Sequence, residues 1–155
     1  MGDLTPNLSR REFKCTGVNC HRSGKGNCGS DTIDFDLVNY LQATVNHFKL
    51  KYGRDVRIDI TGPNRCKTHN DALREKYKRT GGKFGAKTAK GSQHALFRAA
   101  DFKLFFRDEN KQISPREVFD YLDKKYGNKV ALGLYVNRCH IDTRTYSGKP
   151  IRWEV

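Results

Sequence analysis

The sequence lacks the features that mark membrane, fibrous or disordered proteins. It contains no apolar run of about 20 residues, the length that a membrane-spanning helix needs. It also has no internal repeat and no low-complexity tract. Residues 1–11 lack the apolar stretch of a secretory signal peptide. We therefore expect a globular chain that is made in a cytoplasm and does not insert into a membrane.

Acidic residues are scarce relative to basic ones. The chain has 17 Asp and Glu against 30 Lys and Arg, a net charge of +13. Such a charge keeps a protein in solution and also attracts polyanions, either nucleic acid or an anionic cell envelope. The basic residues are spread along the chain, which argues against a nucleic-acid-binding tail. With 155 residues the chain is predicted to form one domain, residues 1–155.

The five cysteines are an odd number, and without a signal peptide disulfides are not expected. Cys15, Cys20 and Cys28 lie in an irregular, glycine-rich segment, residues 1–31. They resemble part of a structural zinc site, and Cys66 is a candidate fourth ligand from elsewhere in the fold. The alternative is a set of free or paired thiols in a loop.

Hydrophobic periodicity predicts an α+β domain in which a central antiparallel sheet carries helices on one side. Helices are expected at residues 34–52, 69–79 and 115–126, and strands at 56–60, 99–106, 131–136, 139–143 and 151–155. The third helix follows a capping box formed by Ser114 and Glu117. Residues 80–91 are predicted to be a mobile basic loop. Cys139 is expected to face the core, opposite its neighbour His140.

Two short motifs carry the chemistry. His94 and Asp101 stand seven residues apart, and His140 and Asp142 flank a single residue near the C-terminus. Residues two apart on a strand share one face, so the second pair should point the same way. Imidazole and carboxylate groups together suit a cation such as Zn²⁺. Three protein ligands with one open position would form a hydrolytic site, and Arg65 is expected at a nearby strand end.

Each of these residues also has an ordinary explanation. A single histidine is more often a core or surface residue than a ligand. Asp101 can cap a strand end, Asp142 can pair with Arg144, and Arg65 can be a surface charge. The ordered combination is more specific than any one of its parts.

Further motifs surround these residues. The segments are, in chain order, Leu8-Ser9-Arg10-Arg11-Glu12-Phe13-x-Cys15, Thr61-Gly62-x-x-Arg65-Cys66-x-x-His69-Asn70, Gly81-Gly82, Ser92-x-His94 with Ala99-x-Asp101, Gly133-x-Tyr135, His140-x-Asp142-x-Arg144 and Arg152-Trp153. Together they resemble the zinc peptidases that cleave bacterial cell-wall peptides. These are the D-Ala-D-Ala carboxypeptidases and L-Ala-D-Glu endopeptidases, including phage endolysins, whose zinc core is shared with hedgehog signalling domains. The resemblance covers nearly the whole chain and implies their fold.

The resemblance implies that His94 and Asp101 are the first two zinc ligands. The third should come from the segment that contains His140 and Asp142. In many relatives this segment is His-x-His and the second histidine binds the metal, a position that Asp142 holds here. The favoured assignment makes His140 the ligand and Asp142 the general base or an orienting group. The alternative places Asp142 on the metal and gives His140 the acid/base role.

The resemblance also implies two substrate-binding residues and shows two departures. Arg65 would bind a substrate carboxylate or the developing oxyanion, and Ser92 would hydrogen-bond the substrate or a ligand. Asn137 stands where several relatives have an acidic catalytic base, which shifts that role to the third-ligand segment or signals reduced activity. Phe97 replaces a glycine usually found between the first two ligands.

These observations predict a zinc-dependent hydrolase of peptidoglycan stem peptides, of either the carboxypeptidase or the endopeptidase type. We expect a monomeric phage lysin that acts on bacterial peptidoglycan at the cell wall, or from within a virion. One alternative is a non-catalytic zinc domain that binds the wall or another protein. A nucleic-acid-binding protein with an accidental motif is a third hypothesis.

Overall fold

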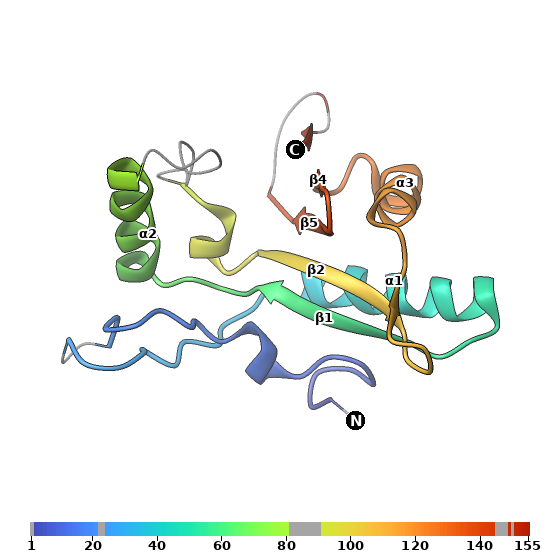
Figure 1. The fold of residues 1–155 in the computed structure, drawn as a ribbon, viewed down its shortest axis with the longest axis horizontal. Coiled ribbons are helices and arrows are strands. Elements are labelled where there is room, and N and C mark those ends of the chain that lie inside the picture. Colours follow the sequence, from blue (N-terminus) through green and yellow to red (C-terminus); the bar gives the residue numbers. More distant parts are fainter. Residues whose placement is uncertain (1, 22–23, 81–90, 145–148, 150) are drawn as a thin grey trace.

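The computed structural model describes residues 2–21, 24–80, 91–144, 149 and 151–155. Most of the predicted mobile loop, residues 81–90, lies outside them. The expected α+β class is confirmed: helices, short 3₁₀ turns and one sheet form a single compact domain (Figure 1). The elements are η1 (Arg10–Phe13), α1 (Phe35–Tyr52), β1 (Val56–Gly62), α2 (Lys67–Thr80), η3 (Gln93–Leu96), β2 (Ala99–Phe106), β3 (Lys111–Gln112), α3 (Pro115–Tyr126), β4 (Ala131–Tyr135), β5 (Arg138–Asp142) and β6 (Arg152–Glu154).

The sheet is mixed, where the sequence predicted an antiparallel one. Its strand order is β1-β2-β5-β4-β6, and the short β3 pairs with β2. All pairs are antiparallel except β4 with β6. The reason is topological. β2 already occupies one edge of β5, so the chain returning from β5 pairs with the free edge of β4, where it runs parallel to β4.

One face of the sheet packs against α1 and α3 to form the core. Alternate residues of β2 (Phe102, Leu104 and Phe106) are buried on this face. The core also takes Leu37, Leu41, Val45 and Phe48 of α1, Val118, Phe119 and Leu122 of α3, and Leu8 and Phe13 of the N-terminal segment. The other face of the sheet is therefore left to the intervening residues of β2 and β5, which carry the predicted site.

The helices predicted at residues 34–52 and 115–126 are confirmed to within one residue, whereas α2 begins two residues before and ends one residue after the predicted range 69–79. Asp34 caps α1, and Gly53 ends it in the left-handed conformation that glycine tolerates best. The capping box of α3 does not form, because Ser114 makes no side-chain cap hydrogen bond. Glu117 instead accepts a hydrogen bond from Nζ of Lys51, at 2.6 Å, which ties α3 to the end of α1.

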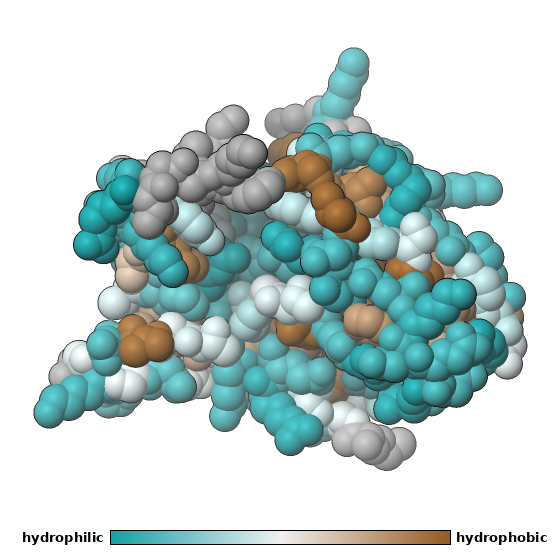
Figure 2. Space-filling view, in the orientation of Figure 1, coloured by the Kyte–Doolittle hydropathy of each residue, from teal (hydrophilic) through white to brown (hydrophobic). Residues whose placement is uncertain are grey.

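Helix α2 stands apart from this core. Figure 1 shows it beyond the end of β1, away from α1 and α3. None of the described α2 residues belongs to the hydrophobic core, and mainly hydrophilic side chains cover the helix (Figure 2). Among the described residues, no helix is both long and apolar enough to span a bilayer.

Candidate metal centres

The three predicted metal ligands meet on the polar face of the sheet. His94 lies in η3, Asp101 in β2 and His140 in β5. Asp101 and His140 are direct cross-strand partners, and η3 leads into β2. One ligand atom from each residue lies within 4.8 Å of the other two, so the group can hold a metal ion. We call these three residues the His/Asp group.

Each histidine presents one particular nitrogen to Asp101. Nδ1 of His94 lies 3.0 Å from the carbonyl oxygen of Pro63, which assigns the proton to Nδ1 and leaves Nε2 3.6 Å from Oδ1 of Asp101. Nε2 of His140 lies 3.0 Å from Oδ2 of Asp142. Nδ1 of His140 lies 2.8 Å from Oδ1 of Asp101, the oxygen that also faces His94. A tetrahedral ion with bonds of about 2.1 Å separates its ligands by about 3.4 Å, so the donor set fits such an ion.

Asp142 lies behind His140 and not in the His/Asp group. Its side chain has no exposed surface, and Nε and NH2 of Arg144 donate to its two oxygens at 2.7 and 2.6 Å. The ordinary explanation, a salt bridge with Arg144, is thus correct. So enclosed a carboxylate is placed to orient His140, which is one of the two roles predicted for Asp142 with His140 as the ligand, and it lies outside the group that can hold a metal. Although burial opposes the change, the hydrogen bonds from Arg144 lower the pKa of Asp142 to about 2.

The protonation states favour metal binding at His94 and Asp101. Burial lowers the pKa of His94, which keeps its imidazole neutral. Burial opposes ionisation of Asp101, but the hydrogen bond from His140 holds its pKa well below the usual range. Burial likewise opposes the charged form of His140, yet its two carboxylate partners raise its pKa.

Arg65 and Ser92, the predicted substrate-binding residues, both adjoin His94. The backbone N–H of Arg65 donates to the carbonyl oxygen of His94 at 3.1 Å. After the larger effect of burial, the Arg65 charge further lowers the pKa of His94 and of His69. Ser92 is the N-cap residue of η3, half-buried and without a cap hydrogen bond. Arg65 is thus tied to His94 through its backbone, and Ser92 stands two residues before His94 in the chain.

Arg138 and Trp153 are site residues to which the sequence assigned no role. Nε of Arg138 lies 3.8 Å from Oδ2 of Asp101, so the two oxygens of this carboxylate face different partners. The ring of Trp153 lies 5.0 Å from that of His140. A β-carbon at Gly133 would overlap the Trp153 ring. Arg138 stands two residues before His140 on the same strand, so the sequence pattern could have predicted that both side chains share one face of the sheet.

The two departures from the resemblance have clear positions. Asn137 lies exposed in the turn between β4 and β5, and its carbonyl oxygen accepts a hydrogen bond from Gln112. Phe97 ends η3 with φ of 60°, in the left-handed region. This conformation explains why glycine suits the position, since a bulky residue there is strained.

The cysteines form a second group beside the start of α2. Sulfur atoms of Cys15, Cys20, Cys28 and Cys66 all lie within 4.8 Å of one another, and all four are free thiols. Cys66 thus joins the three predicted ligands, and the group, here called the cysteine cluster, can hold a metal ion. Burial raises the pKa of the Cys66 thiol to about 12. Cys139 is buried on the core side of β5, as predicted.

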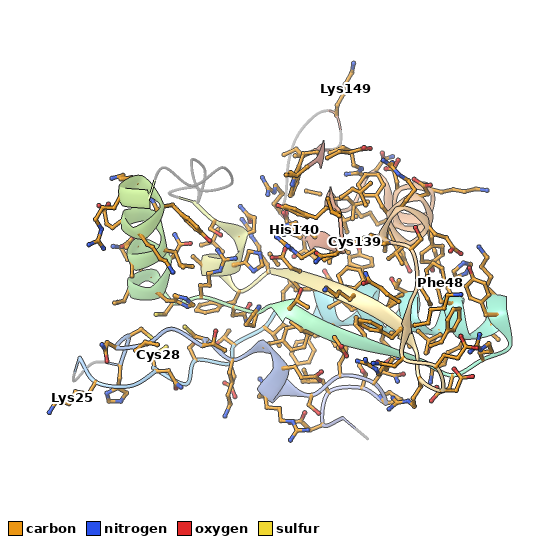
Figure 3. All side chains as sticks on the ribbon, in the orientation of Figure 1. Lys25, Cys28, Phe48, Cys139, His140 and Lys149 are labelled. Carbon is orange, nitrogen blue, oxygen red and sulfur yellow. The ribbon has the colours of Figure 1, made fainter. Side chains whose placement is uncertain are left out.

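The two groups occupy different regions. Figure 3 shows Cys28 on the N-terminal segment below α2, and His140 on β5. Figure 2 shows the surface hollowed between α2 and the β4–β5 hairpin, with hydrophilic residues on the floor.

No family model, curated protein or solved structure matches this chain. The resemblance to cell-wall peptidases therefore stays a prediction that its motif residues carry.

Proposed function

We propose that this chain is a zinc-dependent hydrolase of peptidoglycan stem peptides, and that its catalytic zinc binds to the His/Asp group. The orientation of the two imidazoles carries the proposal. His94 and His140 each engage one nitrogen with an oxygen behind it and turn the other toward Oδ1 of Asp101. This arrangement is typical of metal-binding histidines, whose second nitrogen is held by a carbonyl or a carboxylate. We propose zinc for the cysteine cluster also, in a structural role.

The metal and the surrounding residues have separate tasks in this proposal. Zinc, when bound, lowers the pKa of a coordinated water and polarises the scissile carbonyl. Asp142 orients the ring of His140. Arg138 pairs with Oδ2 of Asp101, the oxygen that does not face the histidines. Arg65 offers a planar, permanently charged group to a substrate carboxylate or a developing oxyanion. Ser92, two residues before His94, would offer a hydroxyl to the substrate or to a metal ligand.

The substrate class follows from charge and from the resemblance. Stem peptides carry carboxylates, and bacterial walls often carry anionic polymers. A chain with a net charge of +13 is drawn to such a surface by long-range attraction that salt weakens. We therefore expect a monomer whose binding to walls and rate of hydrolysis both fall as ionic strength rises.

A non-catalytic zinc domain that binds the wall or a protein is the second candidate. Two observations favour it. Asn137 holds the position of the usual catalytic base, and an amide cannot accept the proton of a water molecule. Asp142, the other expected base, has no exposed side-chain surface. This candidate predicts metal binding and wall binding without turnover.

Purified peptidoglycan incubated with the zinc-loaded chain tests the proposal. We expect new free amino groups to appear and the products to show one cleaved bond by mass spectrometry. Chelator and His94→Ala should each abolish release. His47→Ala is the matched control, because His47 stacks on Tyr121 in the α1–α3 interface and should leave hydrolysis in place. Wall binding without any release by the zinc-loaded chain would establish the second candidate instead.

A further inference from the structure

We propose that the cysteine cluster binds one zinc ion through four thiolates, and that this ion anchors α2 in place of a hydrophobic core. The same ion would fix residues 63–66, which contact both metal groups. The position of α2 would depend on this ion whether or not the chain is a hydrolase. Four steps support it: sulfur spacing, hydrogen bonds to sulfur, the lack of core contacts in α2, and the link to His94.

The spacing of the sulfur atoms suits one tetrahedral ion. A zinc ion with Zn–S bonds of about 2.3 Å separates its sulfur ligands by about 3.8 Å. The sulfur atoms of Cys15 and Cys20 lie 3.8 Å apart, and the whole set lies within 4.8 Å. Tetrahedral sites with four sulfur ligands select zinc or iron. Zinc suits a site whose only task is structural, since it has no redox chemistry.

Backbone N–H groups point at three of the sulfur atoms. Cys28 donates to the sulfur of Cys20 at 3.2 Å, and Cys66 donates to that of Cys15 at 3.4 Å. His69 donates to the sulfur of Cys66 at 3.3 Å. Such bonds stabilise negative charge on sulfur, the form that binds metal. In the metal-free chain the Cys20 thiol instead donates to the carbonyl of Gly17, at 3.1 Å.

No described side chain of α2 belongs to the hydrophobic core. Of its described residues only Asn70 is buried, and the Oδ1 atom of Asn70 has no hydrogen-bond partner. A helix that is polar on nearly all sides gains little stability from burial. Its first turn is where it meets the cluster: Cys66 precedes it, and Nδ1 of His69 lies 3.4 Å from the sulfur of Cys15. The position of α2 therefore depends on the cluster.

Residues 63–66 connect the cluster to the His/Asp group. Pro63 accepts the hydrogen bond from Nδ1 of His94, and Arg65 donates its N–H to the carbonyl of His94. Cys66 follows directly and belongs to the cluster. An ion at the cluster thus immobilises the segment that orients one imidazole of the other group. Its loss should release α2 and Arg65, and weaken metal binding at His94.

Metal analysis and amide hydrogen exchange of the full chain test this proposal. The native chain should bind two zinc ions, and Cys20→Ser and Cys28→Ser should each bind one. In both variants α2 and the described part of residues 15–30 should lose protection by at least about tenfold, while β2 keeps its protection. The matched control is Cys139→Ser, which replaces the cysteine outside the cluster and should retain two ions and native protection.

The outcomes separate this proposal from the proposed function. His94→Ala should bind one zinc and keep α2 protected, since the cluster is intact. A native chain with no metal at the cysteines, or with disulfides there, would overturn the inference. So would a Cys20→Ser chain that keeps two ions and a protected α2. If the cysteine variants fail to fold, native chain refolded without zinc should show the same loss of protection in α2. Absence of hydrolysis alone would leave the metal count and exchange pattern unaltered.

Discussion

The two ends of this molecule are stabilised in different ways. Around β2 and β5 a hydrophobic core supports the sheet, and two of the three residues of the His/Asp group lie on these paired strands. Around α2 the structure shows no contribution to that core from the described residues, and four cysteines gather there instead. In the first region the hydrophobic core positions the residues that can bind metal. In the second, we propose that metal binding by the cysteines supplies the stability that the core gives elsewhere.

The two groups differ in how their ligands are assembled. In the His/Asp group, cross-strand register places Asp101 opposite His140, and only His94 comes from outside the sheet. In the cysteine cluster the ligands come from loops and from the start of a helix. Short-range pairing cannot define such a site, and under the proposal above its order depends on the ion. The predictions below test this contrast, starting with the largest effect.

Phe102→Ala should destabilise the whole chain. Phe102 is buried in β2 at the centre of the core, and such truncations cost about 3–5 kcal/mol. Urea unfolding followed by far-ultraviolet circular dichroism should show one transition at lower denaturant. Leu50→Ala, at an 85% exposed position of α1, is the control and should change stability by less than about 0.5 kcal/mol. Loss of α2 alone in Phe102→Ala would contradict the division between the two ends.

Asp142→Asn should weaken metal binding at the His/Asp group by about 10–100-fold, because the amide holds the His140 ring less firmly. Competition with a fluorescent chelator measures this affinity. Asp108→Asn, which removes an exposed partner of Arg54, is the control and should leave the affinity unchanged. An unchanged affinity in Asp142→Asn would remove the positioning role assigned to this carboxylate.

Two glycine substitutions should have smaller effects, each on metal affinity at a different group. A β-carbon at Gly62 would overlap the Asp101 side chain, and one at Gly17 would overlap the His69 ring. Each overlap should cost about 1 kcal/mol. Gly62→Ala should lower metal affinity mainly at the His/Asp group, and Gly17→Ala mainly at the cysteine cluster. The control is Gly53→Ala, which strains a left-handed helix end remote from both groups. Equal effects of the first two variants on both sites would argue against separate sites.

The sequence predicted most elements because their signals are local. The apolar spacing in residues 37–48, with Gly53 after it, defined α1, and alternation in residues 99–106 defined β2. Strand alternation predicted only that His140 and Asp142 share one face, and the resemblance implied that His94, Asp101 and His140 come together. The ordered motif supplied the rest of that prediction.

Other features depend on contacts that no short segment encodes. The parallel pairing of β4 with β6 follows from which strand edge is free. The burial of Asp142 depends on Arg144 folding back over it. Cys66 joins the other cysteines through the path of the chain after β1. The strain at Phe97 became visible only through its left-handed backbone.

Cobalt titration of the metal-free chain tests the central claim most directly, namely that the molecule holds two metals in two different ligand sets. We predict two spectroscopic species. One should show the strong sulfur-to-cobalt charge-transfer absorption of a four-thiolate site and disappear in Cys20→Ser. The other should show weaker visible bands without that absorption and disappear in His94→Ala. A single species, or one that either variant removes entirely, would contradict the account.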